Sequence, residues 1–162
     1  MKSYSSQDVA KAREWCEIKG FPKVFDESEL IEYYVMPQSI NPDFPKFVWA
    51  CANPREGVFG IADSVNERFR IFPVLHEFLE SKFSESGRDE NTCLGVLLSE
   101  LCAAGRVLSP VEFREGYVPF RKDFFDNLVS YAQSHPNDYS SGDIEGFRRS
   151  RDYLVRFLGG AS

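Results

Sequence analysis

Apolar residues recur at helical spacing near the start of the chain, at Val9, Ala12 and Cys16. Intervals of three and four residues place such side chains on one face of a helix. Ser5 or Ser6 can cap this helix, and Asp8 completes a capping-box pattern with Ser5. Gly20 is placed to end it, because glycine readily adopts the left-handed conformation that follows the last turn of many helices. We therefore predict a first helix that ends at Gly20.

The next part of the chain has the composition of β-strands. Residues 24–36 contain the run LIEYYVM, whose β-branched and aromatic side chains favour a strand, although 29–32 could equally start a short helix. Two short apolar runs, 47–52 and 58–62, are separated by Asn-Pro-Arg-Glu-Gly. A short loop with proline and glycine between two such runs is typical of a β-hairpin. We predict a strand at 24–36 and a hairpin at 47–62.

The hairpin leads into a helix that carries a histidine. Ser64, with Glu67 three residues later, has the pattern of a capped turn. Pro73 opposes an unbroken helix through this region but is well placed as the first residue of a new one. We expect this helix to start near Pro73, to end before Gly87, and to place His76 at the boundary of the core.

The second half of the chain has helical patterning throughout. Residues 92–104 carry apolar side chains on one side, and we expect that helix to end at Gly105. The Ser-Pro pair at 109–110 predicts a short helix, and apolar spacing at 124–132 and 144–157 predicts two more. The fold class is therefore α+β, with a small antiparallel sheet from the N-terminal half packed against several helices, and a helical C-terminal half.

Length and charge narrow the class of protein and the kinds of partner. A chain of 162 residues most often forms one domain, so we expect a single domain over 1–162. The formal net charge is -6, with 19 basic residues scattered among 25 acidic ones. This balance argues against nucleic acid or an anionic membrane surface as the main partner. No apolar run approaches the roughly 20 residues of a membrane span, so we expect no membrane association.

The four cysteines, at positions 16, 51, 93 and 102, form no CxxC pair. Each stands among apolar neighbours, where a reduced cysteine behaves as a small buried hydrophobe. The first residues are polar, and no apolar segment of a signal peptide follows them. We therefore expect buried, reduced thiols in a soluble, cytoplasmic protein.

The histidine helix gathers the strongest candidates for chemistry. His76, Glu77 and Glu80 lie within one turn of one another. In a helical HExxH motif the residues at i and i+4 bind zinc, and the intervening glutamate acts as general base. His76 and Glu80 are then the candidate zinc ligands and Glu77 the candidate catalytic base. A catalytic zinc site usually has three protein ligands, and the candidates for the third are Glu90 or Glu100.

Residues 67–80 resemble the active helix of the ImmA/IrrE-type minimal zincin peptidases. That pattern runs from an arginine-rich turn through Phe-Thr and a small apolar pair to His-Glu-x-x-His. Residues 72–77 follow it here, and a predicted strand and turn precede the helix. Glu80 stands in place of the second histidine, and Arg68 and Arg70 are one residue out of register. The resemblance implies a zincin-like scaffold, with zinc as cofactor if the site is intact and no cofactor if it is degenerate.

Two classes of function compete. A binding or regulatory protein on a degenerate zincin-like scaffold explains the missing histidine, the acidic composition and the aromatic share of 15%. A metal-dependent hydrolase or peptidase explains the cluster on the histidine helix better. The aromatic residues between 117 and 131 either grip a partner or, as their helical spacing favours, fill the core. We favour the binding class and expect a protein partner, and we expect His135, in a polar loop, to be incidental.

Overall fold

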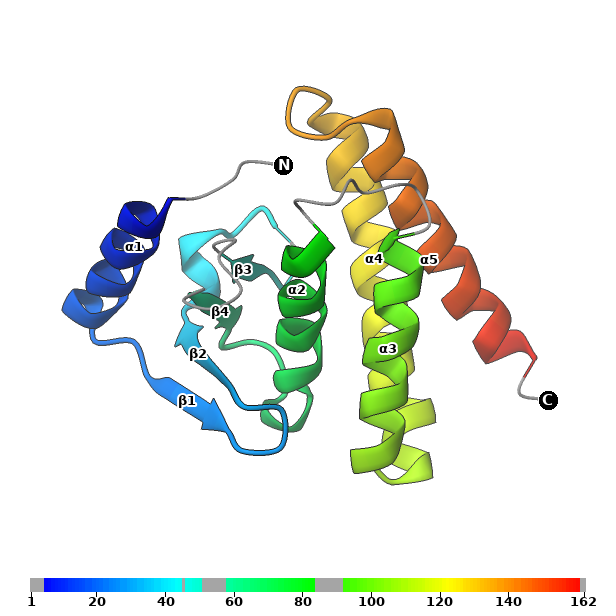
Figure 1. The fold of residues 1–162 in the computed structure, drawn as a ribbon. Coiled ribbons are helices and arrows are strands. Elements are labelled where there is room, and N and C mark those ends of the chain that lie inside the picture. Colours follow the sequence, from blue (N-terminus) through cyan, green and yellow to red (C-terminus); the bar gives the residue numbers. More distant parts are fainter. Residues whose placement is uncertain (1–4, 45, 51–57, 84–91, 161–162) are drawn as a thin grey trace. The chain divides into compact units, whose positions relative to one another are not determined.

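The chain folds into two compact units, Met1–Gly87 and Arg88–Ser162, in this computed structural model (Figure 1). The structure describes residues 5–44, 46–50, 58–83 and 92–160. A small sheet lies in the first unit, and the second is helical, so the α+β prediction is confirmed. The single domain over 1–162 stays a prediction.

The N-terminal unit opens with helix α1, Ser6–Lys19. The Ser5 hydroxyl accepts the backbone N–H of Asp8, and the Asp8 carboxylate accepts the backbone N–H of Ser5, which completes the predicted capping box. Gly20 follows the helix with φ at 71°, a left-handed conformation that suits glycine. Both ends of this helix were therefore predicted correctly from the sequence.

Four strands form the sheet, in the order β1-β2-β4-β3. Their bounds are Lys23–Asp26 (β1), Ile31–Met36 (β2), Val48–Ala50 (β3) and Phe59–Ala62 (β4). Strands β3 and β4 pair antiparallel, as the predicted hairpin requires, and the predicted loop at 53–57 lies outside the described residues. Strands β2 and β4 pair parallel, so the sheet is mixed and not wholly antiparallel.

The segment predicted as one strand, 24–36, is two strands joined by a tight turn. Strands β1 and β2 pair antiparallel, with Asp26 opposite Ile31 at the end of the ladder. The Asp26 carboxylate accepts the backbone N–H of Glu29 at 2.9 Å, which stabilises the turn. Leu30 completes the turn with φ at 55°. The single-strand prediction is wrong because aspartate can reverse the chain by such a bond without glycine or proline.

Helix α2, Ile71–Phe83, follows the sheet after a short 3-10 turn, η2, at Glu67–Phe69. Asn66, not Ser64 as predicted, caps η2 by accepting the backbone N–H of Arg68. The Ser64 hydroxyl instead donates to the side chain of Gln38 at 2.8 Å, in the 3-10 turn η1, Gln38–Ile40. Helix α2 lies against β3 and β4 (Figure 1).

The C-terminal unit begins with helix α3, Thr92–Val107, which runs through Gly105 and does not end there. An isolated glycine weakens a helix but does not have to end it. The cysteine prediction also needs correction, because Cys102 on this helix is exposed, and Cys93 is half-buried. Cys16 in the N-terminal unit is buried as predicted, and Cys51 lies outside the described residues.

The helices predicted at 109 and at 124–132 form one continuous helical run. A π-helical segment, η3, covers Glu112–Tyr117, and helix α4, Val118–Ser134, continues directly from it. Helix α5, Ser141–Gly159, packs against both α3 and α4 (Figure 1). Among the helices in the described part of the chain, none is both long enough and apolar enough to cross a membrane.

Candidate functional site

Helix α2 brings His76 and Glu80 together in the N-terminal unit. His76 Nε2 lies 3.5 Å from Glu80 Oε1, as the i, i+4 spacing predicts. The two side chains are only 5% and 14% exposed. His76 is therefore buried and does not lie at the boundary of the core as the sequence suggested. Glu77, the candidate base, is half-buried at the next position of the helix.

The separation of the two ligand atoms fits a shared metal ion. Tetrahedral zinc with bonds of about 2.0–2.1 Å to nitrogen and oxygen places two ligand atoms about 3.3 Å apart. His76 Nε2 and Glu80 Oε1 nearly match this value without any movement. The same separation also suits an ion pair between a protonated imidazole and a carboxylate. Geometry alone is therefore compatible with both functions considered from the sequence.

A third protein ligand near His76 and Glu80 would favour a metal site over a simple ion pair. Among the described residues of the N-terminal unit, no other histidine, cysteine or carboxylate joins His76 and Glu80 in a three-ligand group. Glu90, one of the two candidates, lies outside the described residues. Glu100, the other, lies on α3 in the C-terminal unit, where Arg121 and Tyr117 bind both of its carboxylate oxygens. Both Glu100 oxygens thus accept hydrogen bonds within the C-terminal unit, and Glu90 or Glu100 as the third zinc ligand stays a prediction.

The turn that leads into α2 is fixed by Arg70. Its Nε donates to the backbone carbonyl of Val65 at 2.9 Å, and its Nη2 donates to that of Asp63 at 3.0 Å. The Asp63 carboxylate in turn accepts the backbone N–H of Gln38. Arg70 thus ties the end of β4 to the start of α2. This role explains the arginine without any contact to a substrate.

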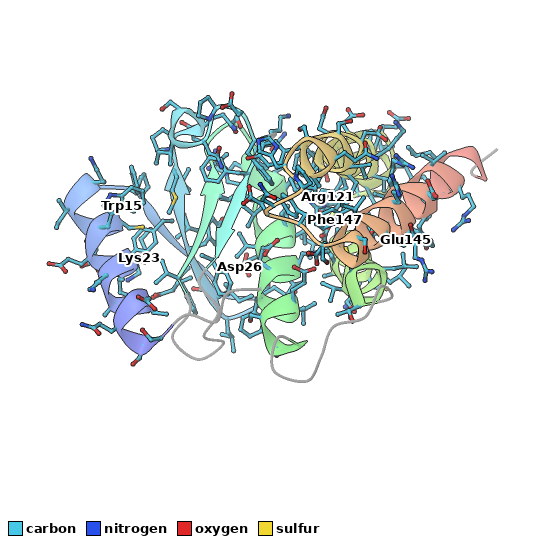
Figure 2. All side chains as sticks on the ribbon, turned by 90° about the horizontal axis from the view of Figure 1, so that it is seen from above. Trp15, Lys23, Asp26, Arg121, Glu145 and Phe147 are labelled. Atoms are coloured by element: carbon cyan, nitrogen blue, oxygen red, sulfur yellow. The ribbon has the colours of Figure 1, made fainter. Side chains whose placement is uncertain are left out.

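A second buried polar cluster lies in the C-terminal unit, around Glu100. Arg121 donates from Nε to Glu100 Oε2 at 2.9 Å and from Nη2 to Oε1 at 2.8 Å. The Tyr117 hydroxyl donates to Oε2 as well. All three side chains are buried, and Figure 2 shows Arg121 among the helices of this unit. We call Glu100, Tyr117 and Arg121 the carboxylate network.

The electrostatics of the carboxylate network keep its tyrosine protonated. Burial raises the pKa of Tyr117 well above its ordinary value, the negative charge of Glu100 raises it further, and Arg121 opposes both. Tyr117 is thus a hydrogen-bond donor and not a proton carrier near neutral pH. The Arg121 guanidinium also lies 4.7 Å from the ring centre of Phe124 and 5.0 Å from that of Phe125, a cation–π arrangement.

Sequence reasoning did not identify the carboxylate network. One signal was present, because Glu100 falls among Leu97, Leu101 and Ala104 on the buried side of α3. A carboxylate on such a face needs a buried partner. The sequence did not indicate that this partner is Arg121, which looks like any charged residue at the start of an amphipathic helix.

The remaining candidates have structural roles among the described residues. His135 follows α4, stacks on Tyr131 with ring centres 4.0 Å apart, and has Nδ1 2.8 Å from the Tyr131 carbonyl oxygen. Of the aromatic residues between 117 and 131, Tyr117 and Phe125 are buried. Core packing therefore accounts for these two, as helical spacing favoured.

Comparison of the chain with protein-family models, with curated proteins and with solved structures finds no match. The resemblance of residues 67–80 to the minimal zincin peptidases therefore stays a prediction.

Proposed function

We propose that this protein is a binding or regulatory protein that acts through a protein partner, on a degenerate zincin-like scaffold. The observation that carries the proposal is Leu30, in the turn between β1 and β2. Its side chain is 75% exposed although its backbone has φ at 55°. For an L-residue this left-handed conformation costs about 1–2 kcal/mol, which glycine avoids.

Because its side chain is 75% exposed, Leu30 gains little burial that would offset this backbone cost. Burying a leucine in a partner stabilises a complex by about 1.5–3 kcal/mol, which exceeds the backbone cost. Phe25, on β1 beside the same turn, is also exposed, at 52%. Backbone strain kept at an exposed apolar residue points to a contact made outside the chain.

Charge at the same turn indicates the chemistry of the partner. Asp26, Glu27 and Glu29 lie between the two apolar residues and are acidic. We propose a partner with an apolar pocket bordered by lysine or arginine, because opposite charges at the rim raise the rate of association and set orientation. We also propose a cytoplasmic location, which the free thiols of Cys93 and Cys102 suit because disulfides are rare there.

Capture of partners with matched variants tests the binding function. The tagged chain is expressed in its own cells, and a captured protein is purified and titrated against it directly. We expect Leu30→Gly and Phe25→Ala to weaken that binding by at least tenfold and added salt to weaken it further. Ile40→Ala, at an exposed apolar site in η1, is the control and should bind normally. Equal binding by all four proteins would refute the proposed surface.

A metal-dependent hydrolase is the second candidate, and the 3.5 Å approach of His76 Nε2 to Glu80 Oε1 is the observation that favours it. Zinc content after loading and dialysis separates the candidates. The binding function predicts far less than one zinc per chain, with no change in His76→Ala. Stoichiometric zinc that is lost in His76→Ala and in Glu80→Gln, but retained in a His135→Ala control, supports the hydrolase instead. Glu77→Gln should then abolish hydrolysis and keep the zinc.

A further inference from the structure

The π-helical segment η3 is an unusual element at the start of the long helical run in the C-terminal unit. The backbone N–H of Val118 donates to the carbonyl of Phe113, five residues earlier, where an α-helix would use Arg114. Such a turn holds one residue more than an α-helical turn. It therefore rotates the preceding residues by about 100° relative to an unbroken α-helix.

Side chains anchor the run on both sides of this turn. Upstream, Ser109 and Glu112 cap the start of the run, because the Ser109 hydroxyl accepts the Glu112 N–H at 3.1 Å and the Glu112 carboxylate accepts the Ser109 N–H at 2.9 Å. The Phe113 ring packs edge-on against Phe157 of α5, with ring centres 6.0 Å apart. The capping bonds lie within the run itself, so the contact of Phe113 with Phe157 is the one that fixes the rotation of this part of the helix against α5.

Downstream, the carboxylate network fixes the rotation after the turn. Tyr117 is the last residue of η3, and Arg121 lies four residues later, on the same face of the helix. Both donate to Glu100 on α3. A π turn satisfies the upstream and downstream anchors together, whereas an α-helical turn between them would rotate one set out of contact.

We propose that Glu100 is a latch that holds this helix in the π register, and that releasing it lets residues 112–117 close into an α-helical turn. The rearrangement shifts the hydrogen bonds of the turn by one residue and changes the rotation of the segment that carries Val111 relative to α4. Val111 and Val107 are exposed apolar side chains at this end of the unit. The latch therefore controls how that apolar surface is presented. This inference does not depend on the proposed function.

The acceptor of the Val118 N–H reports the register directly. Scalar couplings across hydrogen bonds, measured by NMR on deuterated protein, identify the carbonyl that this N–H contacts. We expect coupling to Phe113 in the unmodified chain and coupling to Arg114 in Glu100→Leu and in the double variant Glu100→Leu, Arg121→Met, which both remove every hydrogen bond to Glu100. Lys122→Ala is the control, since it removes an ion pair to Asp126 on the same helix without touching Glu100.

The double variant leaves no charge buried without a partner, so it decides the matter if Glu100→Leu alone fails to fold. Coupling that stays with Phe113 in the folded double variant overturns the latch, as does coupling to Arg114 in the unmodified chain. A shift to Arg114 in the Lys122→Ala control overturns it too, because the turn would then respond to changes unrelated to Glu100.

Discussion

Arg121 binds both carboxylate oxygens of Glu100, at 2.9 and 2.8 Å, and the two side chains are only 3% and 0% exposed. A bidentate pair of this kind joins α3 to α4 with a defined orientation. Removing two charges from water is costly, so such a pair is weak evidence for stability by itself. The pair instead selects one alignment of α3 and α4, because only that alignment pairs both charges.

Replacement of one member of the pair should lower the free energy of unfolding, and replacement of both members should restore most of it. Arg121→Met leaves the Glu100 carboxylate buried without its cation, and we expect the free energy of unfolding to fall by about 3–5 kcal/mol. Glu100→Leu combined with Arg121→Met removes both charges and should recover most of that loss. Urea unfolding of the single and double variants measures the difference.

An exposed pair on the same helix provides the control. Lys122 and Asp126 are 2.6 Å apart, and their side chains are partly exposed. Lys122→Met should change stability by no more than about 1 kcal/mol, because solvent screens such pairs. A double Glu100→Leu, Arg121→Met variant as unstable as Arg121→Met alone would contradict the argument from desolvation.

Replacement of glycine by alanine should change the stability of the fold in opposite directions at Gly60 and Gly95. A Cβ added at Gly60 on β4 would lie 2.5 Å from the terminal methyl of Met36, so Gly60→Ala forces that side chain aside and should cost about 1–3 kcal/mol. A Cβ at Gly95 on α3 meets nothing within 4 Å. Gly95→Ala should therefore stabilise the chain by about 0.5–1 kcal/mol, because alanine favours a helix. Thermal unfolding of both variants checks the signs, and stabilisation by Gly60→Ala would contradict the packing of Met36.

The features predicted correctly from the sequence are those set by neighbouring residues. The capping box of Ser5 and Asp8 needs only a few consecutive residues, and so does the left-handed Gly20. The hairpin of β3 and β4 and the approach of His76 to Glu80 are also local. Periodicity and capping chemistry therefore suffice for most of the helices and for part of the candidate site.

The features that were missed depend on partners far away in the sequence. The parallel pairing of β2 with β4 leaves no local pattern in either strand. Glu100 on α3 pairs with Arg121 on α4, and on our proposal the π turn is likewise held by contacts to other helices. Burial of His76 likewise depends on tertiary packing, which the amphipathic pattern of one helix does not reveal.

The capping box of α1 should make stability depend on pH. The backbone N–H of Ser5 lowers the pKa of Asp8 most, the Ser5 hydroxyl adds to the effect, and Lys11 contributes a smaller part. Because the pKa is depressed in the folded state, the stabilisation is present above the unfolded value of about 3.9 and is lost as pH falls through the folded value. Unfolding of Asp8→Asn measured between about pH 2 and 6 should lack this part of the pH dependence.

The two donors to Asp8 can be separated by one variant. Ser5→Ala removes the hydroxyl and keeps the backbone N–H, so the pKa of Asp8 should rise only part of the way to its ordinary value. NMR titration of the Asp8 side chain measures this. A pKa that returns fully to the ordinary value would show that the hydroxyl, and not the backbone, is the main cause.

Replacement of Leu30 tests whether this exposed side chain stabilises the fold or is retained for contact with a partner. Its φ of 55° is unfavourable for any side chain with a Cβ. Leu30→Gly relieves this strain but adds freedom to the unfolded chain, which costs about 0.5–1 kcal/mol. Little apolar burial is lost, because the side chain is exposed. We therefore expect Leu30→Gly to be more stable than the unmodified chain by a few tenths of a kcal/mol to about 1 kcal/mol.

Leu30→Ala is the matched variant, since it removes most of the side chain and keeps the Cβ that causes the strain. Leu30→Ala should be no more stable than the unmodified chain. In urea unfolding, the free energy of unfolding of Leu30→Gly should be about 1 kcal/mol higher than that of Leu30→Ala. Such a result would mean that leucine at this position opposes folding, as expected of a residue retained for contact with a partner. If Leu30→Ala and Leu30→Gly both destabilise the chain equally, the Leu30 side chain stabilises the β1–β2 turn, and the strain argument for a partner surface fails.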